Sequence, residues 1–209
     1  MAAPPGANSI LLVNGTLGAN ASCTIRLDLQ VTATTAGSLT SPAVVLSSNQ
    51  APNATAAAIT LTVTVPAPTF TMAFAPNPRT LSLSPSGVVA TGTLTFTITN
   101  NAAIPLTGLS FNHTLPVAPP LTIGPGAPPA LPASCGAGAT LTATVGGNTI
   151  RFTGGSVDVG QTCTVTIPVQ TGTLTATGDY NYPNSPVTLN STQAAPVQTG
   201  PVTWRVVVN

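Results

Sequence analysis

Charged side chains are almost missing from this chain of 209 residues. It has no lysine and no glutamate, and charged residues make up 3% of it, against about 25% in an ordinary soluble protein. Four arginines cannot form the dense basic surface that holds phosphate groups, which argues against nucleic acid as a partner. The three aspartates, Asp28, Asp158 and Asp179, are too scattered to predict an acidic metal site.

The chain also lacks a long apolar run and a second histidine, which argues against a membrane span, a metal site and a thiol enzyme. Mean hydropathy is +0.40, yet proline, glycine and threonine interrupt every apolar stretch before it reaches the roughly 20 residues of a membrane-spanning helix. The single histidine, His113, has no second histidine, cysteine or carboxylate near it in sequence, so it is a poor metal ligand and no general base stands beside a cysteine. We therefore expect no membrane span, no cofactor, no metal and no catalytic residue.

Threonine, serine and asparagine take the place of charge, and they alternate with apolar residues. Between Gly160 and Gln170, every second residue from Cys163 to Val169 is apolar, which is the pattern of a strand with one buried face. No window has the apolar spacing of a helix, so we expect an all-β fold with essentially no helix. The predicted strands cover residues 9–13, 22–32, 39–46, 59–65, 70–74, 81–83, 93–100, 106–115, 140–145, 148–153, 160–170, 171–176, 180–189 and 202–208, with an irregular proline-rich loop at 117–132.

The strand around Cys163 has an earlier copy around Cys23, 140 residues upstream (163 − 23). Gln30 and Gln170 keep the same spacing, and residues 202–208 match residues 59–65. Prolines at 66–68 mark a domain boundary, so residues 68–209 form a complete repeat, whereas residues 1–67 correspond only to its second half. Half a sandwich exposes an apolar face and unpaired edges, and we expect another chain or segment to complete it.

Three motifs, at residues 74–78, 92–100 and 106–116, carry a resemblance to a known family. The chain resembles the conserved repeat domain of unknown function found in tandem in large bacterial surface and secreted proteins. The family pattern continues with a Cys-Gly pair, a Gly-Gly turn and a second cysteine, here Cys135-Gly136, Gly154-Gly155 and Cys163. The resemblance implies an immunoglobulin-like β-sandwich that serves as a stalk or fibre module and has no catalytic residues. The chain departs from the pattern at His113, where such repeats usually carry an acidic residue.

We expect structural roles for the cysteines, the histidine and the large aromatic residues. We expect a disulfide between Cys135 and Cys163, worth roughly 3–4 kcal/mol in the chain-entropy description, and an unpaired or intermolecular Cys23. His113 is expected to form a local hydrogen bond at the end of a strand, and Trp204 to be buried, in phase with its valine neighbours. The tyrosines are expected either to pack at a sheet edge or to lie in an interface; the possible interface residues are Tyr180, Tyr182, Ile59, Leu61 and Val63.

These observations favour a non-enzymatic structural protein, part of an extracellular fibre or a cell-surface stalk. Successive units would assemble head to tail through β-strand edges, with copies of the chain itself or neighbouring repeats as partners. The alternative is an adhesin-type binding module that recognises a glycan or a protein through loops such as residues 117–132.

Overall fold

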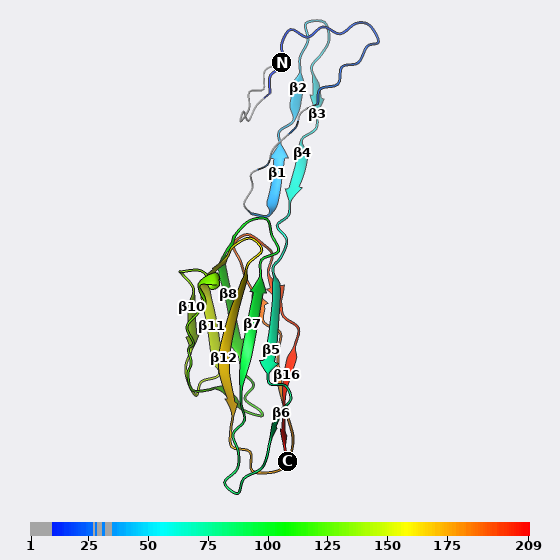
Figure 1. The fold of residues 1–209 in the computed structure, drawn as a ribbon. Coiled ribbons are helices and arrows are strands. Elements are labelled where there is room, and N and C mark those ends of the chain that lie inside the picture. Colours follow the sequence, from blue (N-terminus) through cyan, green and yellow to red (C-terminus); the bar gives the residue numbers. More distant parts are fainter. Residues whose placement is uncertain (1–9, 27, 29–30, 32–34) are drawn as a thin grey trace. The chain divides into compact units, whose positions relative to one another are not determined.

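The computed structural model describes residues 10–26, 28, 31 and 35–209. The chain divides into two compact units, Met1–Thr32 and Ala33–Asn209. Every strand described below lies in the second unit, and Figure 1 follows them along the chain.

The fold is an immunoglobulin-like β-sandwich, and its described residues contain one 3₁₀ turn and no α-helix. The strands are β1 (Gly37–Ser41), β2 (Val44–Leu46), β3 (Ala54–Ala56), β4 (Ile59–Val63), β5 (Thr69–Ala75), β6 (Arg79–Leu81), β7 (Thr91–Thr99), β8 (Leu106–Thr114), β9 (Leu121–Ile123), β10 (Thr140–Ala143), β11 (Thr149–Val157), β12 (Thr162–Thr171), β13 (Gly178–Asn184), β14 (Thr188–Leu189), β15 (Val197–Gln198) and β16 (Val202–Val208). The 3₁₀ turn, η1, covers Ala133–Cys135.

One layer of the sandwich is a four-stranded sheet in the order β5-β7-β12-β9. The strands facing it form the sheets β10-β11-β8 and β13-β16-β6, and β14 and β15 form a separate short pair. All of these pairs are antiparallel except β16 with β6, which is parallel. Two further pairs, β1-β4 and β2-β3, form a separate hairpin arm.

The alternation of apolar and polar residues places one face of each long strand in the core. In β7, Leu94, Phe96 and Ile98 are fully buried, whereas the threonines between them point outward. Phe111 of β8 meets Phe96 across the two layers, with ring centroids 4.6 Å apart. On the outer side, threonine hydroxyls of β7 and β12 hydrogen-bond across the ladder, as between Thr99 and Thr162 at 3.1 Å. The all-β prediction and its buried faces are therefore confirmed.

Several details of the predicted strands are wrong. The strands predicted at 39–46 and 180–189 are each interrupted, as β1 and β2 and as β13 and β14. The loop at residues 117–132 is not wholly irregular, because β9 lies within it and pairs with the end of β12, burying Leu121 and Ile123. The strand predicted at 171–176 ends at Thr171, since beyond that residue only an isolated bridge between Leu174 and Val88 is available. The strand expected at 81–83 lies earlier, as β6, because β16 provides a parallel partner there.

The first unit has no assigned strand among its described residues, apart from a single-residue bridge at Leu11. The strands predicted at 9–13 and 22–32 are therefore wrong where they can be judged, at residues 10–13 and 22–26; residues 9, 27, 29–30 and 32 lie outside the described residues. The reason is pairing. The matching strands of the sandwich, β11 and β12, form ladders with β8 and β7, whose sequence motifs occur once in the chain. Without such partners, a strand cannot form its hydrogen bonds.

Candidate functional site: the uncovered hairpin arm

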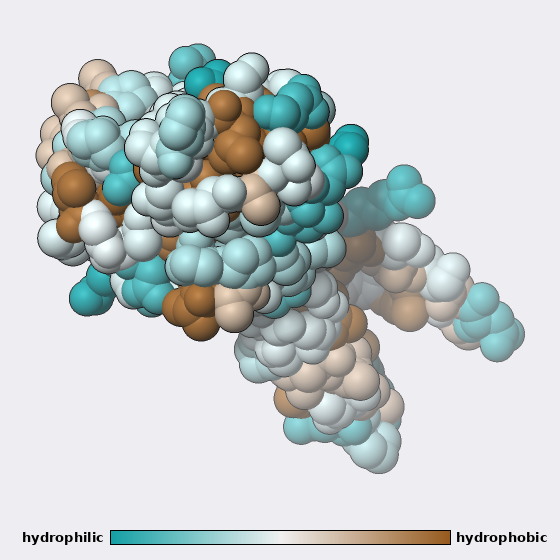
Figure 2. Space-filling view, turned by 90° about the horizontal axis from the view of Figure 1, so that it is seen from below, coloured by the Kyte–Doolittle hydropathy of each residue, from teal (hydrophilic) through white to brown (hydrophobic). Residues whose placement is uncertain are grey.

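Among the residues that the structure describes, histidine, cysteine and acidic side chains do not gather into a metal-binding group. In the described part of the chain, no three histidine, cysteine, aspartate or glutamate side chains are grouped as a metal site would require. Asp179 instead forms an exposed ion pair with Arg205, with 2.7 Å between carboxylate and guanidinium. No helix in the described residues is long and apolar enough to cross a membrane. Figure 2 shows one side of the surface, where pale residues predominate and brown apolar residues stand in small groups between them.

His113 lies near the end of β8 as expected, but it is buried, and its hydrogen-bond partner is distant in sequence rather than local. Its Nε2 lies 2.9 Å from Oδ1 of Asn184, so it joins β8 to β13, and its ring and that of Phe96 pack edge to face with centroids 5.7 Å apart. Because the amide nitrogen of Asn184 already donates to the Tyr182 carbonyl, Oδ1 is the free acceptor and Nε2–H of His113 donates to it. Burial lowers the pKa of His113, and the Asn184 hydrogen bond opposes that shift. The side chain is a neutral structural link.

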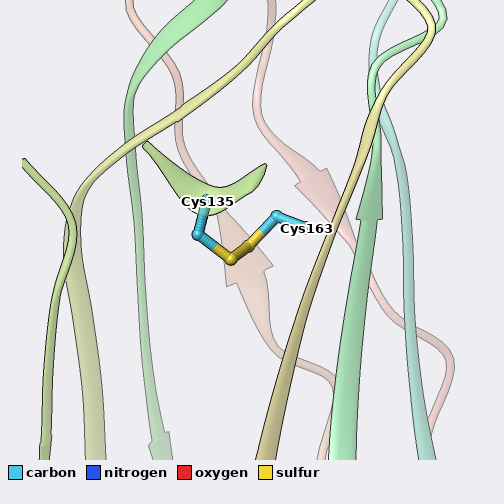
Figure 3. Close-up of a disulfide and its surroundings, with 2 residues drawn as sticks. All are labelled: Cys135 and Cys163. Carbon is cyan, nitrogen blue, oxygen red and sulfur yellow. A yellow bond between two sulfur atoms is a disulfide. The ribbon is translucent and has the colours of Figure 1, made fainter. Parts of the chain in front are cut away.

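A disulfide joins Cys135 in η1 to Cys163 in β12 (Figure 3). Both residues are fully buried, and their Cα atoms are 4.7 Å apart. The bond fixes the end of the proline-rich loop against the central sheet. Cys23, the counterpart of Cys163 in the first unit, is free and exposed.

The β13-β16 hairpin is covered on its inner face by the start of the domain. Trp204 is fully buried and stacks on Phe74 of β5, with centroids 5.6 Å apart and planes 11° apart. Its indole Nε1–H donates to the carbonyl of Pro76 at 2.8 Å. Tyr182, directly opposite Trp204 in the ladder, is 1% exposed.

The outer edge of β16 is closed by the same segment. Asn77 accepts a hydrogen bond from the backbone N–H of Arg205 and donates one to the carbonyl of Thr203, at 2.9 and 2.8 Å. Two residues later β6 begins, and it pairs in parallel with the end of β16. Phe74–Leu81 thus covers both the face and the edge of this hairpin, and we call it the clasp.

The β1-β4 hairpin repeats the β13-β16 hairpin in the same register. Leu39 pairs with Leu61 as Tyr182 pairs with Trp204, and both partners are shifted by 143 residues (182 − 39 and 204 − 61). The short ladders beyond them keep this shift, since Leu46 pairs with Ala54 as Leu189 pairs with Val197 (189 − 46 and 197 − 54). The two segments therefore form the same pairing pattern over their whole length.

Even the turn at the tip is duplicated. Ser48 Oγ accepts a hydrogen bond from Ala51 N–H at 2.9 Å and donates to the Ala51 carbonyl at 3.4 Å. Ser191 makes the same two contacts with Ala194, each at 3.0 Å. A serine turn of this kind closes both hairpins with side chain to backbone bonds and needs no tertiary partner.

The two hairpins differ in what covers them. Leu39 and Leu61 are 48% and 49% exposed, whereas their counterparts Tyr182 and Trp204 are buried. Among the described residues, β4 pairs only with β1, so its other edge carries no strand. The hairpin arm therefore presents an apolar face and a free edge together.

The proposed interface residues have different positions in the structure. Ile59 and Leu61 are exposed on β4, and Val63 is half-buried. Tyr180 is half-buried, and its hydroxyl donates to the Ala176 carbonyl. An interface role for Tyr182 in this chain is wrong, because its pairing with Trp204 places it in the core, a position that periodicity alone did not distinguish from a sheet edge. Sequence reasoning missed Asn77, whose strand-like contacts lie in a proline-flanked turn.

Comparison with known proteins gives one family. Residues 68–207 match the family described as "Domain of unknown function (DUF7933)". No curated protein matches the sequence significantly.

Comparison with solved structures gives matches of low similarity. A cohesin module of a family 33 glycoside hydrolase from Clostridium perfringens has 7% identity and a TM-score of 0.37, over 70% of this chain and 98% of its own. The seventh ScaB type I cohesin of Pseudobacteroides cellulosolvens has 13% identity and a TM-score of 0.37, over 67% and 92%. The ASH/PapD-like domain of human CEP192 has 7% identity and a TM-score of 0.28, over 66% and 83%.

Proposed function

Since the chain belongs to the DUF7933 family through residues 68–207, we propose that it is a structural, non-enzymatic segment of an extracellular fibre or cell-surface stalk. Residues 1–67 are the second half of a further unit of the same kind, and residues 68–209 are a complete unit. The units join head to tail through β-strand edges and apolar faces, with copies of the chain or neighbouring repeats as partners.

One observation carries this proposal: the arm repeats the register of a core hairpin, with its apolar face uncovered. An open edge beside exposed leucines is a template for pairing with another polypeptide. The near absence of charge supports the same conclusion, because surfaces with little like-charge repulsion associate readily. The buried disulfide favours an oxidising, extracellular location.

The test is the mass and shape of the purified chain over a dilution series, by light scattering and negative-stain electron microscopy. We expect oligomers or filaments that dissociate on dilution. In the double variant Leu39→Thr, Leu61→Thr, the particles should shift to monomers, because threonine keeps the strand and removes the apolar face.

The matched control is Val117→Thr, which makes the same change at a loop residue of the sandwich that is 71% exposed. It should leave association unchanged. Compact monomers of the unmodified chain at every concentration would overturn association through the arm.

A further inference from the structure

The free edge of β4 corresponds to the outer edge of β16. The clasp covers that edge of β16, so its contacts show what a partner of β4 would look like. Subtracting 143 from the residue numbers of β16 identifies the backbone groups of β4 that would make the same contacts. The N–H of Arg205 corresponds to that of Thr62, and the carbonyl of Thr203 to that of Thr60. Leu61 takes the place of Trp204, on which Phe74 stacks.

The direction of these backbone groups agrees with an edge site. In β16, Arg205 N–H points away from β13, since its acceptor is Asn77. Thr62 lies opposite Ser38 as Arg205 lies opposite Asn181, so its N–H also points away from the neighbouring strand. An asparagine side chain offering one acceptor and one donor fits this N–H and the Thr60 carbonyl together.

We propose that β4 binds a segment with the chemistry of the clasp, Phe-Ala-Pro-Asn-Pro-Arg-Thr-Leu, supplied by a further copy of the first half of this domain. The asparagine bonds Thr62 N–H and Thr60 O, the phenylalanine covers Leu61, and the following residues extend along the strand. This inference rests on the proposed structural function and specifies its partner.

The numbers of hairpins and of clasp motifs indicate where the binding segment comes from. The described residues form two hairpins of this register, and the sequence contains one clasp motif. Its single clasp already closes β16, where Trp204, Thr203 and Arg205 are all engaged. A second copy of these 209 residues cannot place its clasp on β4 without uncovering its own β16, so copies of the chain would associate through the apolar face of the arm alone. The occupant is therefore an additional first half, as a neighbouring repeat would provide.

The experiment measures binding of a fluorescent synthetic peptide with the sequence of Phe74–Leu81 to the full chain, by anisotropy. We expect saturable binding. Thr62→Pro should weaken it about tenfold or more, because proline removes the edge N–H while β1 pairs with the other side of the strand. Thr62→Ala, which keeps the N–H, is the matched control and should bind within about twofold of the unmodified chain.

Two further changes test the contacts without disturbing β4 through proline. A peptide carrying Asn77→Ala loses both side-chain hydrogen bonds and should bind about tenfold more weakly. Leu61→Trp in the chain restores the indole that stacks on Phe74 and donates to the Pro76 carbonyl in the covered hairpin, and it should tighten binding several-fold.

The outcomes separate this inference from the proposed function. Absent or unsaturable peptide binding, or equal binding by Thr62→Pro and Thr62→Ala, would overturn the clasp site, even if the chain still associates through Leu39 and Leu61. Peptide binding that follows the expected order in a chain that never self-associates would uphold the site and point to neighbouring repeats rather than copies as partners.

Discussion

Two hairpins with one pairing pattern, β1-β4 and β13-β16, exist in the same chain in different surroundings. Both have the same register and the same serine turn, yet Leu61 is half exposed where Trp204 is buried. The pairing is local, because alternation and the turn determine it within about thirty residues. The burial comes from a distant segment, since Phe74 and Asn77 lie more than a hundred residues before β16.

The contrast separates forming a hairpin from stabilising a domain. A two-stranded hairpin gains little by itself in water, whereas the same hairpin under a clasp contributes the largest aromatic group of the core. Substitutions at matched positions of the two hairpins should therefore have very different effects on the free energy of unfolding.

The largest difference is expected at the pair Trp204 and Leu61. Trp204→Ala removes the stack on Phe74 and leaves a cavity, so it should lower the free energy of unfolding by about 3–5 kcal/mol. Leu61→Ala should change it by less than about 0.5 kcal/mol, because half of that side chain is already in water. Urea unfolding followed by circular dichroism measures both variants, and similar losses would show that the hairpin arm is covered in solution.

The cysteines offer the same comparison between two matching positions, Cys23 and Cys163. Replacing Cys135 and Cys163 together by alanine should cost roughly 3–4 kcal/mol, because the disulfide restricts the unfolded chain over a separation of 28 residues. Cys23→Ala, at the position matching Cys163, should leave urea unfolding unchanged, since Cys23 is free and exposed. A comparable loss from Cys23→Ala would mean that it forms a stabilising bond of its own.

Much of the sandwich could be predicted from period-two alternation, which is a local property. Leu94, Phe96 and Ile98 are buried as their spacing predicts. What could not be predicted depends on contacts between distant segments. β9 is three residues in a proline-rich loop, and β6 is a parallel strand that exists because β16 lies beside it.

The candidate site was predicted in part for the same reason. The match between residues 59–65 and 202–208 identified the exposed residues Ile59 and Leu61. Nothing in the local pattern shows that Asn77 closes a strand edge, or that Tyr182 lies in the core beside Trp204. The incomplete state of residues 1–67 and the boundary at residues 66–68 remain predictions.

A smaller difference in stability is expected between two glycine substitutions, one beside Trp204 and one in β1. A Cβ on Gly92 would lie 2.7 Å from the Trp204 ring and 3.1 Å from the Ala75 carbonyl, so Gly92→Ala should cost about 1–3 kcal/mol. Gly37, in β1, has no atom within 4 Å of that position, and Gly37→Ala should be neutral or slightly stabilising because it restricts the unfolded chain. Thermal unfolding of both variants tests this, and a neutral Gly92→Ala would show that the indole can move away.

The smallest effect concerns His113, which links the covered hairpin to β8 through Asn184. Burial lowers its pKa, so the unfolded chain binds this proton more tightly than the folded chain. Stability should therefore be unaffected by His113 above its ordinary pKa of about 6.5 and should fall as pH drops below that value. The slope cannot exceed about 1.4 kcal/mol per pH unit for one proton, and it ends once pH passes below the folded pKa.

The measurement is urea unfolding between pH 7.5 and 4.5 for the natural chain and for His113→Asn. The variant is expected to be less stable throughout, because the contact with Asn184 changes, but to lose the part of the pH slope that begins near 6.5. Aspartates contribute equally to both curves, so the difference between the slopes isolates His113. Parallel curves would mean that His113 takes up its proton in the folded sandwich as readily as in the unfolded chain.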